Sequence, residues 1–124
     1  MGVGINMEIK QVLTRVYVSD MNSAIDFYEG LFNKKCSLRL NYQEVNLELA
    51  QVENVLILSG DEKSLAPFRD TKATFLVDSV AEYKAYLLEN GATIIRDLKE
   101  VPTGFNMTVK HADGTVVEYV EHKV

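Results

Sequence analysis

Acid–base and metal chemistry require particular side chains at particular spacings, and few of the 124 residues of this sequence meet both requirements. Glu118 lies in the alternating stretch VVEYVE, where its carboxylate could act as a general base. His111 lies in the preceding alternating stretch and could approach Glu118, and His122 is the other histidine. One carboxylate with one histidine does not make a zinc, iron or manganese site, since such a site takes three or four protein ligands.

The single cysteine, Cys36, follows Lys34 and Lys35, whose positive charges could lower the pKa of its thiol. We nevertheless expect Cys36 to be a buried, unreactive thiol, because free cysteines are among the most buried residues. One cysteine excludes an internal disulfide and fits a reducing compartment, so we expect a cytoplasmic protein.

The charge balance narrows the class of partner. A net charge of −5 and a pI near 5.0 argue against nucleic acid, which needs a basic face, and mildly favour a cationic ligand. No stretch is long and apolar enough to predict a membrane span, and the N-terminus lacks a signal-peptide pattern. Residues 1–6 are unpatterned and read as a frayed or added start, with Met7 a plausible second start.

A strand followed by a helix is the unit that positions these residues. In RVYVSDMNSAIDFYEGLF, Val16 and Val18 alternate as in a half-buried strand, and Asp20 stands where a helix N-cap belongs. The helix that follows carries an apolar stripe at helical spacing: Met21, Ala24, Ile25, Tyr28, Leu31 and Phe32.

The same unit recurs 59 residues later, where Val77 matches Val18 and Ser79 matches Asp20. Ser79 and Glu82 form a capping box, and Gly91 supplies a left-handed helix end. Extended segments are expected after each helix, over residues 36–42, 45–51 and 55–59 and over residues 93–101, 107–111 and 115–121. Asp113 and Gly114 predict a hairpin turn between the last two.

These patterns predict an α+β fold in one domain, residues 1–124, built from two tandem β-α-β-β-β modules. The modules cover residues 12–59 and 71–122, and residues 60–70 read as the linker between them. We expect the two curved mixed sheets to enclose a groove, with the helices outside.

Three stretches carry a resemblance to a known family: YVSDMNSAIDFYEGLF, FLVDSVAEYKAYLLENGA and HADGTVVEYVEHK. In their order and spacing they resemble the vicinal-oxygen-chelate superfamily, which contains glyoxalase I, bleomycin-resistance proteins and extradiol dioxygenases. The resemblance extends from about Val12 to His122. It implies a groove that binds a small molecule, and a homodimer, with the groove formed either within one chain or across two.

The resemblance also implies four metal-ligand positions, and only one of them carries a suitable side chain. Leu13 and Lys72 occupy the two first-strand positions, and Ile57 or Ser59 occupies the third. Neither Leu13 nor a protonated lysine can coordinate a cation. Glu118 alone remains, so we expect no metal site of the family type and no cofactor. A Glu118 left from such a site would pair with Lys72 on a neighbouring strand.

Strand alternation then indicates which polar groups line the groove that the resemblance implies. With Leu13 facing the cavity, Arg15 and Tyr17 face it too, as do Lys72 and Thr74 on the matching strand, together with Glu118. A mostly apolar pocket with a few polar groups is typical of a small-molecule site. The alternative for Arg15 is that its charged end extends to the rim.

The loop PTGFN, residues 102–106, lies where members of the superfamily close over a ligand. Gly104 would permit bending, Phe105 could stack on a ligand, and Asn106 could form a hydrogen bond with it. The alternative is a plain connection between two strands.

Three functions follow from these expectations. The first is a glyoxalase-like or bleomycin-resistance-like protein that binds a small organic ligand without a family-type metal. The second is a lyase, isomerase or dioxygenase of the same superfamily that uses Glu118; in a metal-free version Arg15 would stabilise an oxyanion. The third is a subunit-interaction module without a small ligand, which a groove filled by large side chains would indicate.

Overall fold

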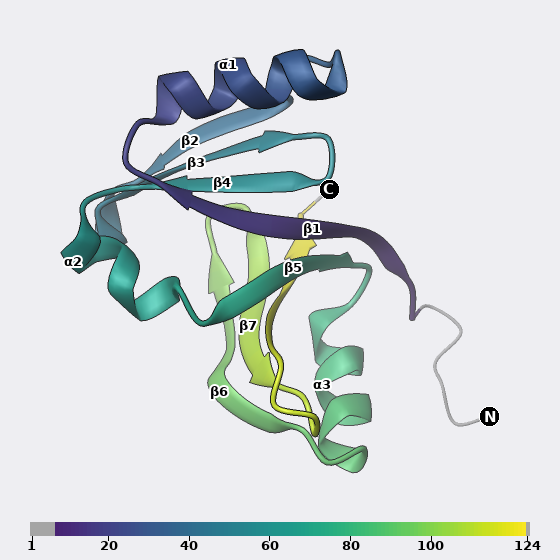
Figure 1. The fold of residues 1–124 in the computed structure, drawn as a ribbon. Helices are drawn as coiled ribbons and strands as arrows, with labels where there is room; N and C mark the ends of the chain where they lie inside the picture. Colours follow the sequence, from purple (N-terminus) through teal and green to yellow (C-terminus); the bar gives the residue numbers. More distant parts are fainter. Residues whose placement is uncertain (1–6, 124) are drawn as a thin grey trace. The chain divides into compact units, whose positions relative to one another are not determined.

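A computed structural model describes residues 7–123, so the unpatterned residues 1–6 lie outside the described part (Figure 1). The described chain divides into two compact units. The N-terminal unit comprises residues 13–70, and the C-terminal unit comprises residues 7–12 and 71–123. The first strand, β1 (Ile9–Val18), contributes residues to both.

The N-terminal unit is a mixed sheet with one long helix. After β1 come α1 (Met21–Phe32), β2 (Leu38–Tyr42), β3 (Leu47–Val52) and β4 (Val55–Ser59). The strand order is β2-β3-β4-β1, and β1 runs parallel to β4 whereas the other neighbours are antiparallel. A 3₁₀ turn, Gln43–Val45, precedes β3. The expected linker contains a short helix, α2 (Glu62–Leu65), and a second 3₁₀ turn, Ala66–Phe68.

The C-terminal unit repeats this plan. It contains β5 (Thr71–Val77), α3 (Val80–Glu89), β6 (Thr93–Val101), β7 (Gly104–Lys110) and β8 (Val116–His122). The strand order is β5-β8-β7-β6, and again the first strand runs parallel to the last. The α+β fold with two β-α-β-β-β modules is therefore confirmed.

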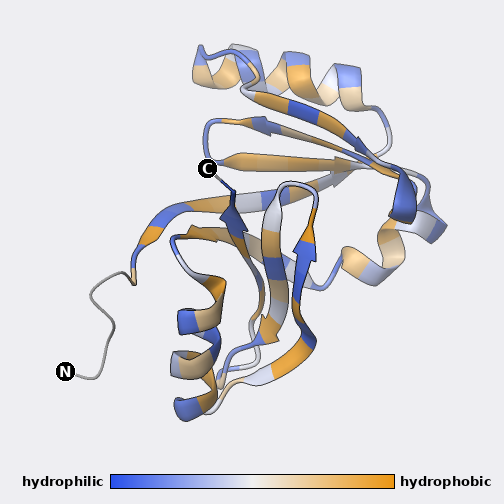
Figure 2. Cartoon of the chain, turned by 180° about the vertical axis from the view of Figure 1, so that it is seen from behind, coloured by the Kyte–Doolittle hydropathy of each residue, from blue (hydrophilic) through white to orange (hydrophobic). Residues whose placement is uncertain are grey.

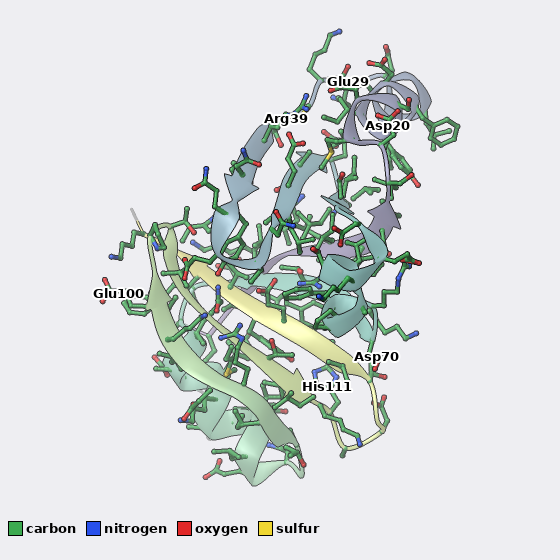
Figure 3. The ribbon with its side chains drawn as sticks, turned by 90° about the vertical axis from the view of Figure 1, so that its left-hand side faces the viewer. Asp20, Glu29, Arg39, Asp70, Glu100 and His111 are labelled. Carbon is green, nitrogen blue, oxygen red and sulfur yellow. The ribbon has the colours of Figure 1, made fainter. Side chains whose placement is uncertain are left out.

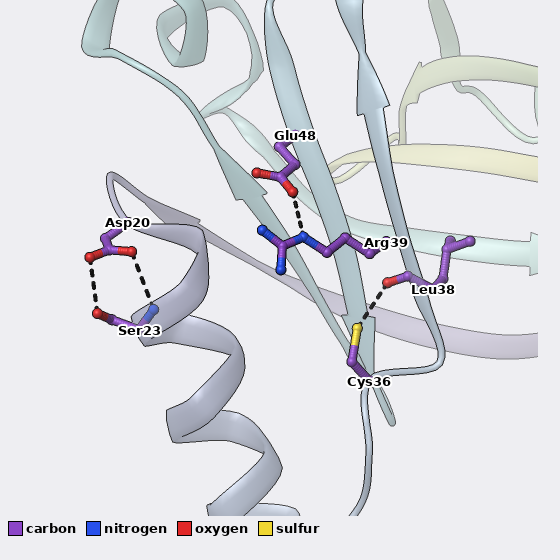
Figure 4. Close-up of polar contacts among 6 residues, drawn as sticks. All are labelled: Asp20, Ser23, Cys36, Leu38, Arg39 and Glu48. Carbon is purple, nitrogen blue, oxygen red and sulfur yellow. Dashed lines mark hydrogen bonds and ion pairs between the residues drawn. The ribbon is translucent and has the colours of Figure 1, made fainter.

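Both long helices begin at the predicted caps. The Asp20 carboxylate accepts the backbone N–H of Ser23 at 3.2 Å (Figure 4). The Ser79 hydroxyl accepts the backbone N–H of Glu82 at 3.2 Å. The backbone hydrogen bond from Ser23 is the main cause that lowers the pKa of Asp20. At the other end of α3, Gly91 adopts a φ of 84°, as the predicted left-handed helix end requires.

The core of each unit lies between its helix and one face of its sheet. In the N-terminal unit Val16 and Val18 pack toward Met21 and Ile25 of α1. In the C-terminal unit the corresponding cluster contains residues of β5, α3, β6, β7 and β8: Phe75, Val77, Val80, Tyr83, Leu87, Ile94, Leu98, Phe105, Met107, Val109, Val117 and Tyr119. Figure 2 shows hydrophobic and hydrophilic residues interleaved along the helices and strands, as this one-sided burial requires.

The predicted loop at residues 102–106 is wrong in its extent. Only Pro102 and Thr103 form the turn, and β7 begins at Gly104. Gly104 has a φ of 150°, and a Cβ atom there would lie 1.9 Å from the carbonyl oxygen of Glu121. Gly104 therefore permits the close approach of β7 to β8.

No helix among residues 7–123 is long and apolar enough to cross a membrane.

Candidate functional site

The Glu118 side chain lies on the sheet face of the C-terminal unit opposite α3. Its neighbours along β8, Val117 and Tyr119, point to the α3 core, so alternation directs Glu118 the other way. On β5, Thr74 is directly opposite Glu118 in the register, and its hydroxyl donates to Glu118 Oε1 at 3.1 Å. Thr74 is only 2% exposed, and the Glu118 side chain is 19% exposed. The carboxylate is therefore partly desolvated.

A row of polar side chains crosses all four strands at this level. Thr108 on β7 is paired with Glu118 in the register, and Arg96 on β6 is paired with Thr108. The Arg96 Nη2 atom lies 4.0 Å from Glu118 Oε2. We call the surface formed by Thr74, Glu118, Thr108, Arg96 and Asn106 the Glu118 face.

Two irregularities in β6 bring Arg96 to this face. Ile94 is paired with Val109 and Arg96 with the next residue, Thr108, so Ile95 is the extra residue of a β-bulge. A second register shift follows between Arg96 and Lys99. Strict alternation from Ile94, which packs in the α3 core, would place Arg96 in that core as well. Arg96 was not predicted as a site residue, because the sequence of β6 contains no signal for the bulge at Ile95.

Asn106 is the most buried polar group of the Glu118 face after Thr74. It lies on β7 opposite Val120, with Met107 pointing to the α3 core, and it is 8% exposed. No donor within residues 7–123 forms a hydrogen bond with its Oδ1 atom. Buried polar atoms in folded proteins are nearly always paired, so this acceptor indicates a position for an outside donor.

Two other predicted contacts of this unit lie elsewhere. Phe105 packs with the α3 core, on the opposite side of the sheet from Asn106, and the Lys123 ammonium lies 5.9 Å from its ring centroid. Lys72 is exposed and lies at a register shift of β5. No ion pair joins Lys72 to Glu118 among the described residues. Arg96 is a cation near this carboxylate.

His111 does not meet Glu118, contrary to what the sequence suggested. Its Nε2 atom forms a hydrogen bond of 2.8 Å with the Tyr119 hydroxyl, and its ring contacts Phe75 in the α3 core. Burial raises the pKa of Tyr119 to about 12. In Figure 3, His111 and Glu100 lie toward opposite ends of this sheet, and the polar row crosses between those ends.

Arg15 and Tyr17 lie in the N-terminal unit, where both have partners. Arg15 Nη1 donates to the Tyr17 hydroxyl at 3.1 Å, and that hydroxyl donates to the Phe68 carbonyl at 2.5 Å. The guanidinium of Arg69 lies 5.7 Å from the centroid of the Tyr17 ring. These contacts hold the turn after α2 against β1.

The implied metal positions do not fit a metal. Leu13 is buried and offers no lone pair, and Lys72 is a cation. The third position was assigned wrongly: Ile57 is buried in the α1 core, and the register makes Leu56, the partner of Arg15, the counterpart of Glu118. Within residues 7–123 no three His, Cys, Asp or Glu side chains gather as a metal site would require.

A cavity of about 380 Å³ lies in the N-terminal unit, and of the predicted site residues only Ser59, a candidate third metal position, lines it. Its lining residues are Asn41, Gln43, Asn46, Leu47, Glu48 and Ser59. Glu48 already accepts from Arg39 Nε at 2.5 Å (Figure 4). Asn46 Nδ2 donates to the Ser64 hydroxyl at 3.2 Å. Because these polar groups are engaged and the Asn106 oxygen is not, the Glu118 face is the stronger candidate.

Among known proteins, solved structures are similar to this chain, and one of them is a relative of 49% identity. No family model and no curated protein matches the chain. Among solved structures, an uncharacterized protein from Methanosarcina mazei is 49% identical, with 94% of each chain covered and a TM-score of 0.83. The chain is thus of one family with that protein.

Two enzymes share the fold at low identity. Methylmalonyl-CoA epimerase from Mycobacterium tuberculosis is 16% identical, with 94% of this chain and 90% of that chain covered and a TM-score of 0.73. The Streptomyces coelicolor epimerase (E43Q), in complex with 2-nitronate-propionyl-CoA, is 13% identical, with coverages of 94% and 100% and a TM-score of 0.72. The chain thus shares the fold of these epimerases, with the two β-α-β-β-β modules that the resemblance to the vicinal-oxygen-chelate superfamily implied.

Proposed function

We propose that this protein binds a small organic ligand on the Glu118 face of its C-terminal unit, without a metal site of the family type. The observation that carries the proposal is the polar row Thr74, Glu118, Thr108 and Arg96, which crosses four strands on the face that α3 does not cover. A polar row across a sheet face serves no purpose in packing a core, whereas it offers a ligand both donors and acceptors.

The separation of Arg96 from Glu118 also supports binding. At 4.0 Å the two charges attract each other without forming a hydrogen bond of normal length. Arg96 supplies N–H donors and Glu118 supplies acceptor oxygens. Such a pair is well suited to a ligand that carries polar groups of both kinds.

A second function is favoured by the same pair. A carboxylate beside a guanidinium could remove a proton next to a carbonyl group and stabilise the resulting oxyanion, with Arg96 in the role first expected of Arg15. Epimerases of this fold have been solved with methylmalonyl-CoA and with a nitronate analogue. A metal-free isomerase or lyase is therefore the alternative to a binding protein.

One experiment separates the two functions. The protein is titrated with methylmalonyl-CoA and with a panel of small organic acids and amides, and the affinities are measured by calorimetry. Glu118→Gln should change the affinity of a bound compound about tenfold or more, because it removes a charged hydrogen-bond partner. Glu100→Gln, an exposed carboxylate near the end of β6, is the matched control and should leave the affinity unchanged.

The same samples in deuterium oxide test for catalysis. A base at Glu118 would exchange the proton next to the carbonyl for deuterium, and Glu118→Gln would abolish that exchange. A binding protein would show no exchange with either variant. Stoichiometric metal in the purified protein, measured by elemental analysis, would contradict the metal-free proposal. The absence of any binding that depends on Glu118 would contradict both functions.

Three further properties belong to the proposal. We expect a homodimer, which sedimentation would show as twice the 14.0 kDa chain mass. We also expect a cytoplasmic location and no affinity for nucleic acid, given the net charge of −5.

A further inference from the structure

The buried Asn106 oxygen restricts what the ligand can be. Asn106 is 8% exposed, and its Oδ1 atom has no donor within the described residues. A buried acceptor without a donor costs free energy, and a ligand that supplies an N–H or O–H group recovers it. The ligand therefore needs a hydrogen-bond donor at this position.

The register shows which charges lie beside that donor. Asn106 lies two residues from Thr108, which is paired with Glu118 on one side and with Arg96 on the other. Diagonal neighbours in a sheet are about 7–8 Å apart between Cα atoms, so both charged side chains can reach a molecule seated on Asn106. Lys99 of β6 is paired with Asn106 itself, so that molecule meets two acceptors, from Asn106 and Glu118, and two cationic donors, Arg96 and Lys99.

We infer that the ligand is a small 2-hydroxy- or 2-aminocarboxylate, an inference that rests on the proposed function. Its carboxylate pairs with the Arg96 guanidinium, and the adjacent hydroxyl or amino group donates to Asn106 Oδ1. A simple carboxylate would leave the Asn106 oxygen unpaired. A dicarboxylate would place a second anion near Glu118, and a cation without a carboxylate would face Arg96.

A matched set of four compounds tests this class: 2-hydroxybutyrate, 2-aminobutyrate, butyrate and 2-hydroxybutyramide. Calorimetry or NMR titration of the full chain should show 2-hydroxybutyrate and 2-aminobutyrate binding about tenfold more tightly than butyrate, because only they supply the donor. The amide should bind at least tenfold more weakly than 2-hydroxybutyrate, because it cannot form the ion pair with Arg96.

Substitutions test whether Asn106 causes the preference for a hydroxyl or amino group and whether Arg96 causes the preference for a carboxylate. Asn106→Leu should reduce the tenfold preference for 2-hydroxybutyrate and 2-aminobutyrate over butyrate to near unity. Asn106→Val is a second variant with the same expectation. Arg96→Gln should weaken all three carboxylates about tenfold or more. Lys84→Gln is the control, because Lys84 is a cation of α3 that pairs with Asp97.

Two results would overturn the inference. In the first, butyrate binds as tightly as 2-hydroxybutyrate, or the preference survives both Asn106 variants. In the second, no member of the set binds, whereas methylmalonyl-CoA or another compound binds in a manner that depends on Glu118. The ligand class is then wrong and the proposed function stands; if nothing binds in that manner, both fail.

Discussion

At the scale of single residues, Asn106 combines two properties that seldom occur together. It lies inside a strand, where alternation directs it away from the core, and yet it is almost fully buried with an unpaired oxygen. Natural proteins retain such costly groups mainly where function requires them. A stability measurement can test this independently of any ligand.

Asn106→Leu should raise the free energy of unfolding by about 1 kcal/mol, because the change replaces an unpaired buried acceptor with an apolar side chain of similar size. Urea unfolding followed by circular dichroism would measure the change. The matched control is Met107→Ala, the next residue, which is fully buried in the α3 core and should lose about 2–5 kcal/mol. A loss of more than about 1 kcal/mol in Asn106→Leu would show that Asn106 is a structural residue.

Individual site residues were predictable where alternation is regular. Thr74 and Glu118 were assigned to the same face, and the structure joins them by a hydrogen bond. Arg96 was missed because the bulge at Ile95 reverses its direction, and sequence alternation cannot detect an extra residue in one strand of a pair. Phe105 was misplaced because the expected loop is part of β7.

At the scale of elements, the turn between β6 and β7 depends on Gly104. The start of β7 runs so close to β8 that a Cβ atom at Gly104 would overlap the Glu121 carbonyl. Asn106 follows two residues later on the same strand.

Gly104→Ala should lower the free energy of unfolding by about 1–3 kcal/mol, since the clash involves backbone atoms that must shift. Gly30→Ala is the matched control: Gly30 lies within α1, and a Cβ atom there would meet nothing within 4 Å. That variant should gain about 0.5–1 kcal/mol from helix propensity. Thermal and urea unfolding would measure both, and equal effects would contradict the close-approach explanation.

Most elements followed from local chemistry. The two N-caps, the left-handed Gly91 and the turn at Asp113 and Gly114 were predictable because each depends on residues adjacent in sequence. The residue of β4 that corresponds to Glu118 was predicted wrongly. The count along the chain gave Ile57 as the counterpart of Glu118, whereas the register gives Leu56. Register depends on partners distant in sequence, so local patterns did not determine it.

At the scale of the whole molecule, the two modules share a plan and differ in chemistry. The positions that carry Thr74 and Glu118 in the C-terminal unit carry Arg15 and Leu56 in the N-terminal unit. The strand face with Leu56 also contains Leu13 and Leu58, and its polar side chains Arg15 and Tyr17 are hydrogen-bonded to each other. The two modules thus have similar sheets, and the polar row that we propose for a ligand lies on the C-terminal one.

The most direct test of this account is an NMR titration of the full-length protein with 2-hydroxybutyrate and with methylmalonyl-CoA, in which backbone and side-chain shifts are followed residue by residue. The account predicts that the largest shift changes occur on the Glu118 face and that Glu118→Gln reduces them. Changes centred instead on the N-terminal cavity near Asn41, Glu48 and Ser59, or changes unaffected by Glu118→Gln, would contradict it.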